Sequence, residues 1–165
     1  MATPTQPLHD EHQELLPHIE QILSIAHSIG ETPVETLRRD VGDVYAFLAY
    51  HLVPHAKAED QALYPVVAQV MGAPEATATM RRDHVEVGRL IEDLAALCGS
   101  LESDVLEATT VKELRRVLYG LYTLIKVHFA KEEEVYLPIL DARLTADEAR
   151  RMYAAMEAAA AKARV

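Results

Sequence analysis

Cysteine and glycine are both scarce in this sequence. The single cysteine, Cys98, excludes an internal disulfide and a metal site made of thiolates. It falls on an apolar helical stripe, where we interpret it as a buried structural thiol. Only 6 of the 165 residues are glycine, whereas the helix-forming residues Ala, Leu, Glu and Arg are abundant. We therefore predict a single all-α domain, large enough to bury a core.

Basic clusters and long apolar runs are also missing. Lys and Arg together number 16 against 26 Asp and Glu, which gives a formal net charge of −10. An acidic chain without basic residues clustered around aromatic ones lacks the electrostatic features of a nucleic-acid-binding protein. No apolar segment approaches the length of a transmembrane helix, and residues 1–7 lack the basic start and apolar run of a secretory signal. We expect a cytoplasmic protein that binds neither nucleic acid nor a membrane.

The chain does contain one motif that occurs twice. The two copies read HLVPHAKAEDQALYP at residues 51–65 and HFAKEEEVYLP at residues 128–138. Three residues recur at a constant offset of 73: His55, Glu59 and Pro65 return as His128, Glu132 and Pro138. Because the His and the Glu are four residues apart in both copies, they lie on the same face of a helix.

The orientation of that face decides what the motif means. On a polar face, each His and Glu would be a surface pair worth roughly 0.2–0.5 kcal/mol. The apolar periodicity instead continues through both motifs, with Val44 and Leu48 before His55 and with Leu121 and Ile125 before His128. A carboxylate facing a core is costly unless it is paired or bound to a metal. We therefore predict a metal site; six polar residues paired inside a bundle without a metal are the minor alternative.

The remaining pattern predicts four long helices and a shorter one. We expect helices at about residues 8–29, 33–71, 74–98, 110–144 and 145–163, with Gly30 and Gly72 ending the first two. The spacing at Thr32, Thr110 and Thr145 is that of a capping box. We predict a flexible lead over residues 1–7, an up-down-up-down bundle over 8–144, and a C-terminal helix over 145–165 that packs on the bundle or on a partner.

Two prolines should disturb these helices. Pro17 falls inside the first helical pattern, where it should bend the helix or mark its true start. Pro54 directly precedes His55 and removes one backbone hydrogen bond, so we expect a kink or a local bulge beside the site.

Two further histidines occupy core-facing places on the other two helices. His12 lies between Leu8 and Leu15, and His84 follows Met80 by one turn. With the two motifs they complete a candidate set of six ligands: His12, His55, Glu59, His84, His128 and Glu132. Four imidazoles and two carboxylates exceed the needs of one tetrahedral zinc and suit two borderline metals such as iron.

At these residues the chain resembles the hemerythrin-like family, also called the HHE cation-binding domain. The resemblance extends from His12 to Pro138 and rests on two HxxxE motifs combined with two single histidines. It implies a non-haem di-iron centre bridged by Glu59, Glu132 and an oxo or hydroxo group, with the four histidines as terminal ligands.

One position departs from the family pattern. Oxygen-carrying hemerythrins have a second His one turn after the ligand on the third helix, and this chain has Gly88 there. One iron should then lack a protein ligand and carry water, or recruit another side chain. We consider His51, one turn before His55, and Tyr136, one turn after Glu132, as candidates for that ligand.

A metal site does not by itself name a reaction. Our first hypothesis is chemistry on oxygen species, with catalase-like or scavenging turnover of peroxide as the leading possibility, because Gly88 widens access. The alternative is a non-catalytic sensor or store of iron, dioxygen or nitric oxide, in which metal loading changes helix order. The sequence assigns no catalytic residue, and it leaves a monomer and a homodimer both open.

Overall fold

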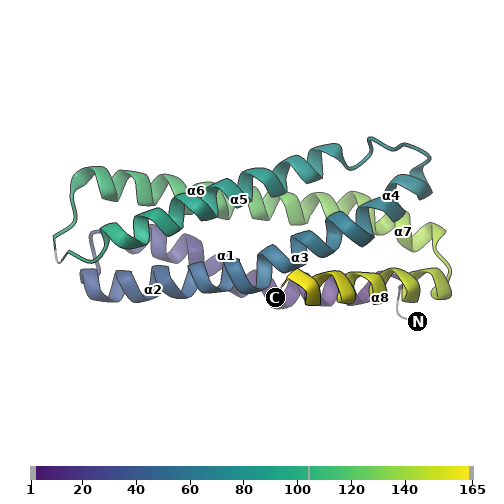
Figure 1. The fold of residues 1–165 in the computed structure, drawn as a ribbon, viewed down its shortest axis with the longest axis horizontal. Coiled ribbons are helices and arrows are strands. Elements are labelled where there is room, and N and C mark those ends of the chain that lie inside the picture. The colour runs from purple at the N-terminus through teal and green to yellow at the C-terminus, as the bar shows by residue number, and fades with distance from the viewer. Residues whose placement is uncertain (1–2, 104, 164–165) are drawn as a thin grey trace.

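The structure, a computed structural model, describes residues 3–103 and 105–163. The described residues are almost entirely helical and form no strand. In order, the elements are α1 (Gln6–Ser28), α2 (Val34–Phe47), η1 (Leu48–Leu52), α3 (Val53–Ala58), η2 (Glu59–Leu63), α4 (Tyr64–Met71), α5 (Ala78–Ser100), α6 (Ala108–Lys131), η3 (Glu132–Tyr136), α7 (Leu137–Arg143) and α8 (Ala146–Ala163). Elements α2 to α4 form one continuous rod, and so do α6 to α7 (Figure 1). The predicted all-α bundle with an additional C-terminal helix is confirmed.

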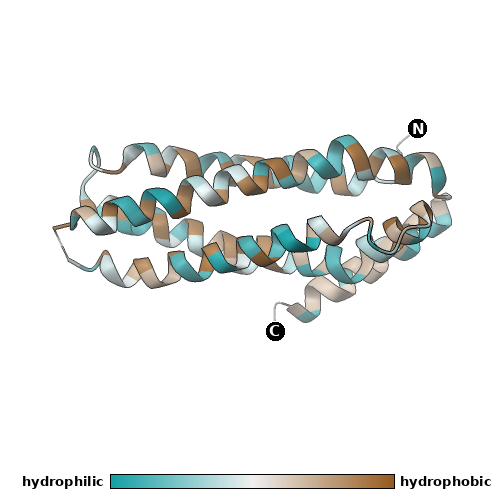
Figure 2. Ribbon diagram, turned by 90° about the horizontal axis from the view of Figure 1, so that it is seen from above, coloured by the Kyte–Doolittle hydropathy of each residue, from teal (hydrophilic) through white to brown (hydrophobic). Residues whose placement is uncertain are grey.

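The four long rods pack as an antiparallel bundle. Helix α1 contacts α2 and α6, α5 contacts α2 and α6, and α4 contacts α7. Hydrophobic and hydrophilic residues alternate along each rod (Figure 2), as expected for helices with one buried face. A large apolar cluster that includes Ile22, Leu48, Leu94 and Leu118 fills one half of the bundle. In the described part of the chain, no helix is both long and apolar enough to cross a membrane.

Helix α8 packs against the bundle beside the repeated motif. It contacts α3 and η2, the elements that carry the first copy (Figure 1). Met152 and Met156 of α8 are buried in a second apolar cluster that also contains Ala58 and Leu63. The burial of these side chains holds α8 against the outer side of the rod that carries the first motif. The domain boundaries proposed above stay a prediction.

Glycine and threonine positions account for several helix ends. Gly30 and Gly72 both adopt positive φ, 91° and 65°, directly after the helices that they were predicted to end. Thr145 and Glu148 form the predicted capping box, in which the side chain of each receives a backbone N–H of the other. The other two boxes were wrong. The helix after Thr32 has no side-chain cap, and α6 begins at Ala108, so Thr110 lies inside it.

In the described residues, three short π-helical segments interrupt the rods, and each ends two residues before a proline. In η1, η2 and η3 the first residue accepts a hydrogen bond from the N–H five residues later. In each case the next residue is a proline, Pro54, Pro65 or Pro138. Proline has no N–H to donate and clashes with the carbonyl four residues before it, so the preceding turn widens. The bulge predicted at Pro54 is confirmed, whereas α1 continues through Pro17.

Cys98 is only half-buried, although its thiol packs against the large apolar cluster and burial raises its pKa.

Candidate metal centre

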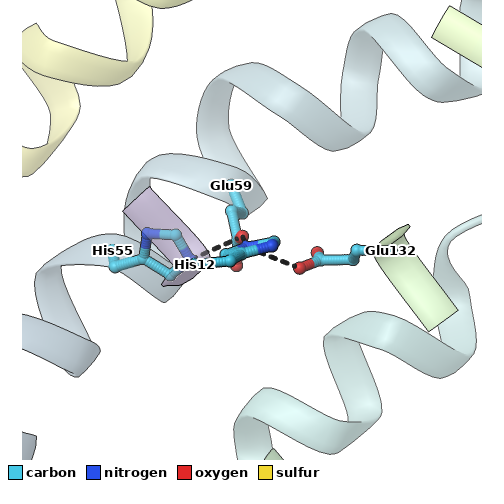
Figure 3. Close-up of side chains that lie close together, drawn as sticks. All are labelled: His12, His55, Glu59 and Glu132. Atoms are coloured by element: carbon cyan, nitrogen blue, oxygen red, sulfur yellow. Dashed lines mark ion pairs between the residues drawn. The ribbon is translucent and has the colours of Figure 1, made fainter. Parts of the chain in front are cut away.

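The six candidate ligands meet in the middle of the bundle. Their donor atoms form two groups, in each of which all donors lie within 4.8 Å of one another. One group is His12, His55, Glu59 and Glu132, and the other is Glu59, His84 and His128. Figure 3 shows the first group, with Glu59 and Glu132 approaching from opposite rods. Four separate rods therefore supply the cluster.

Each of the two glutamates reaches both groups. Oε1 of Glu59 lies 2.8 Å from Nε2 of His55, and its Oε2 lies 3.2 Å from Nε2 of His84. Oε2 of Glu132 lies 3.3 Å from Nε2 of His12, and its Oε1 lies 3.5 Å from Nε2 of His128. Each carboxylate thus lies between the imidazole pair of His12 and His55 and the imidazole pair of His84 and His128.

A carboxylate holds the outer nitrogen of every one of the four imidazoles. The Nδ1 distances are 2.6 Å from His12 to Glu133, 3.0 Å from His55 to Glu11, 3.1 Å from His84 to Asp60, and 3.0 Å from His128 to Asp83. Because a carboxylate accepts a hydrogen bond, it favours the proton on Nδ1 and leaves the Nε2 lone pair facing inward. This arrangement is typical of histidines that bind a metal.

Sequence reasoning did not assign this outer layer. Glu133 and Asp60 are both half-buried and in contact with imidazoles. Each of the four acidic residues directly precedes or follows a candidate ligand in the chain, yet holds the imidazole of a neighbouring rod. The same repeat offsets relate them: 73 residues from Asp60 to Glu133, and 72 from Glu11 to Asp83. That recurrence beside the motif is the signal that could have identified them.

Several of the inward-facing atoms are buried and lack a hydrogen bond. Glu59 and Glu132 are both 0 % exposed, and His12 is 1 % exposed. Among the residues that the structure describes, none forms a hydrogen bond of acceptable geometry with Nε2 of His12 or His55, with either oxygen of Glu59, or with Oε2 of Glu132. Burying such groups without partners is costly. Their convergence is what a bound cation would require.

Without a cation, the electrostatics of the cluster favour protonated imidazoles beside ionised carboxylates. Burial opposes the charge on His12 and His128, but Glu132 and Glu59 outweigh it and raise their pKa values to about 9 and about 10. Burial also disfavours ionised Glu59, yet the charge of His55 together with the other imidazoles holds its pKa well below the usual range. A metal ion entering this site must therefore displace protons.

Tyr64 is a further member of the site that the sequence did not indicate. Its side chain is fully buried. The hydroxyl donates a hydrogen bond to Oε1 of Glu132 at 2.7 Å and lies 3.1 Å from Nε2 of His128. Burial and the negative charges of Glu59 and Glu132 raise the pKa of Tyr64, so the phenol keeps its proton. It lies at the end of the cluster that has fewer ligands.

The two additional candidates lie outside both groups of donors. His51 is exposed and stacks loosely on Phe47, with ring centroids 6.1 Å apart. The hydroxyl of Tyr136 donates to the backbone carbonyl of Ala76 at 2.9 Å. Gly88 lines a pocket that also reaches His84 and His128, and nothing lies within 4 Å of the point where its Cβ would stand. The space of the missing family ligand is therefore open.

Comparison with protein families agrees with this geometry. Residues 3–140 match the family described as hemerythrin HHE cation binding domain. The match covers all six candidate ligands, the four outer carboxylates and Tyr64. Neither the curated proteins nor the solved structures gave a match to the chain.

Proposed function

Because the chain belongs to the hemerythrin HHE cation-binding domain family, we propose that it holds two iron ions and acts on oxygen species, with peroxide decomposition as the leading activity. The observation that carries this proposal is the set of buried, unpaired nitrogen and oxygen atoms that converge between the rods. Acidic groups in such a place need positive charge between them.

The donor set supports two ions of iron. His12 and His55 would hold one, His84 and His128 the other, and Glu59 and Glu132 would be shared by both. Imidazole and carboxylate donors without thiolates suit iron, and six donors are more than one tetrahedral zinc uses. Two bound iron ions would supply the one-electron redox changes that peroxide chemistry needs.

The two ends of the cluster are not equivalent, which supports a small ligand at one of them. One group contains four side chains and the other three, and the smaller group faces the pocket at Gly88. The Tyr64 hydroxyl lies 3.5 Å from Nε2 of His84 at that end. The phenol has a single O–H, which it donates to Glu132 in the metal-free protein. With Glu132 bound to iron, that O–H could turn to donate a hydrogen bond to an incoming peroxide oxygen and orient it.

The proposed reaction balances without another reductant. One hydrogen peroxide is oxidised to dioxygen while another is reduced to water. We expect purified iron-loaded protein to release dioxygen repeatedly when hydrogen peroxide is added, as measured with an oxygen electrode. A Glu59→Gln variant is the matched control and should release much less, because it loses a shared carboxylate. No repeated release from the iron-loaded wild type would overturn the enzymatic proposal.

A second candidate function follows from the position of α8. This helix contacts α3 and η2, which carry His55 and Glu59, so a change in metal occupancy would reach a surface helix directly. We propose as the alternative a non-catalytic sensor or store of iron, dioxygen or nitric oxide. One spectral change per iron centre without turnover would support it. In both cases we propose a cytoplasmic location, in keeping with the single cysteine, and a monomer or homodimer.

A further inference from the structure

The pocket at Gly88 is much larger than the proposed function requires. Its volume is about 270 Å³. Hydrogen peroxide and dioxygen have two non-hydrogen atoms each and would leave most of this space empty. By comparison, an engineered apolar cavity of about 150 Å³ stays dry and binds benzene. The pocket at Gly88 therefore has room for an organic molecule at least as large as a benzene ring.

The walls of this pocket are mostly apolar and belong to three rods. The apolar side chains are those of Leu52, Val53, Ala56, Val85, Val87, Ile125 and Phe129. Lys57 and Asp60 also line the pocket. Hydrocarbon walls give water few hydrogen-bond partners, so transfer of an apolar group into them is favourable. An occupant of this space should therefore have an apolar body.

The inner end of the same pocket is polar. There it is lined by Glu59, His84 and His128, the members of the smaller donor group, and by His55 of the larger group. His84 and His128 bring their Nε2 atoms within 3.0 Å of each other, and the Tyr64 hydroxyl lies beside them. An occupant whose apolar body fills the walls would present its other end to these atoms. That end should carry oxygen able to meet a metal and accept a hydrogen bond.

We propose that the Gly88 pocket binds an organic hydroperoxide, with its hydrocarbon body between Ala56, Gly88 and Phe129 and its peroxide group at His84 and His128. This assignment rests on the proposed peroxide chemistry and names a substrate class for it. The organic hydroperoxide would be reduced to its alcohol and water, while a hydrogen peroxide supplies the two electrons and two protons and leaves as dioxygen. The absence of a side chain at Gly88 is what leaves room for the hydrocarbon body.

Binding can be measured apart from turnover by loading the protein with zinc, which does not change its oxidation state. The probes are cumene hydroperoxide and cumene, which share a body and differ in the peroxide group. We expect saturable binding of the hydroperoxide by calorimetry, with amide chemical shifts changing at Ala56 and Gly88. Cumene should bind at least tenfold more weakly. Equal affinity for both probes would overturn the placement of the peroxide group.

Variants test the location of the site. Gly88→Leu places a side chain in the pocket and should weaken hydroperoxide binding at least tenfold. Gly42→Leu is the matched control, because Gly42 is also a helical glycine with nothing within 4 Å of its Cβ position, and it lies outside this pocket. Because Gly88 is one turn from His84, a second variant is needed that fills the pocket from another rod. Ala56→Leu does so and should also weaken hydroperoxide binding.

Three outcomes separate this inference from the proposed function. The inference would be overturned if Gly88→Leu and Ala56→Leu bound cumene hydroperoxide as tightly as the wild type does. It would also be overturned if the wild type showed no saturable binding. If the iron-loaded protein releases oxygen from hydrogen peroxide but the protein does not bind cumene hydroperoxide, the proposed function is supported and the inference about the pocket is wrong. Binding of cumene hydroperoxide without such oxygen release would support the pocket while contradicting catalase-like turnover.

Discussion

At the scale of single residues, Glu59 and Glu132 define the site, because each reaches imidazoles on both sides of it. Glu59→Gln and Glu132→Gln keep the shape of the side chain but remove its charge. We expect either change to lower bound iron well below two ions per chain, measured by elemental analysis of the purified protein. The matched control is Glu134→Gln, which changes an exposed neighbour and should leave iron content unchanged. Full iron content in both core variants would remove the bridging assignment.

The buried hydroxyl of Tyr64 gives a second prediction. Tyr64→Phe leaves the carboxylate of Glu132 without its hydrogen-bond donor in the metal-free protein. We expect the free energy of unfolding to fall by about 1.5–3 kcal/mol, the usual range for a hydrogen bond to a charged group. Urea denaturation of the metal-free wild type and variant measures this difference in the free energy of unfolding. Tyr136→Phe, which removes a bond to a backbone carbonyl, should cost about 1 kcal/mol and leave the site intact. Equal losses in the two variants would contradict a special role for Tyr64.

One physical cause explains why the sequence indicated Tyr136 and not Tyr64. We counted one turn after each glutamate as four residues, as in a regular α-helix. In η2 and η3 the turn is wider, and the residue that donates its N–H to the glutamate carbonyl is the fifth one, Tyr64 or Leu137. Both of these side chains are fully buried, whereas Tyr136 turns away to Ala76. The six candidate ligands escaped this error because no widened turn separates His55 from Glu59 or His128 from Glu132. The helices α1 and α5, which carry His12 and His84, contain no widened turn.

At the scale of the helical elements, the contribution of the widened turns to metal binding can be tested. Pro65 and Pro138 each follow a shared glutamate by six residues, and both prolines are exposed, so replacing them opens no cavity. Pro138→Ala restores an N–H and allows a regular α-turn, which rotates the residues of α7 relative to Glu132. We expect at least tenfold weaker metal binding, measured by competition with a chelator, in a protein whose helix content does not fall.

Pro17→Ala supplies the control for this element. Pro17 lies inside α1, which continues through it without a widened turn. Because alanine is roughly 3 kcal/mol more favourable than proline in a helix interior, this change should raise stability and leave metal binding unchanged. Equal metal affinity in Pro138→Ala and Pro17→Ala would show that the widened turn is not needed for the site.

The helical elements were predictable from the sequence to the extent that local chemistry decides them. Positive φ at Gly30 and Gly72 ended two helices where expected, and the hydrophobic period placed four rods and the histidines that face their core. The failures came from contacts between rods. The outer carboxylates hold imidazoles of a neighbouring rod, and the volume at Gly88 depends on three rods meeting. Neither is visible in the periodicity of one helix.

At the scale of the whole molecule, the four rods are joined at their centre by charge as well as by apolar packing. In the metal-free protein, imidazolium groups of His12 and His128 lie beside Glu59 and Glu132 and link α1 and α6 to η2 and η3. With iron bound, the metal would take over this linking and the protons would leave. The stability of the metal-free protein should therefore depend on pH more strongly than that of the iron-loaded protein.

This contrast gives the last prediction. The pKa values of His12 and His128 rise from 6.5 to about 9 and about 10 in the folded protein, so their stabilisation is complete below 6.5 and is lost as pH rises through those values. We expect the thermal midpoint of metal-free protein to fall between about pH 7 and pH 10, by roughly 2–4 °C for each 1 kcal/mol lost. Iron-loaded protein should show no such fall, because its imidazoles carry no proton on Nε2. A Glu132→Gln variant should flatten the slope of the metal-free protein, and a wild-type midpoint that stays level or rises over this window would contradict the proposed charge pairing.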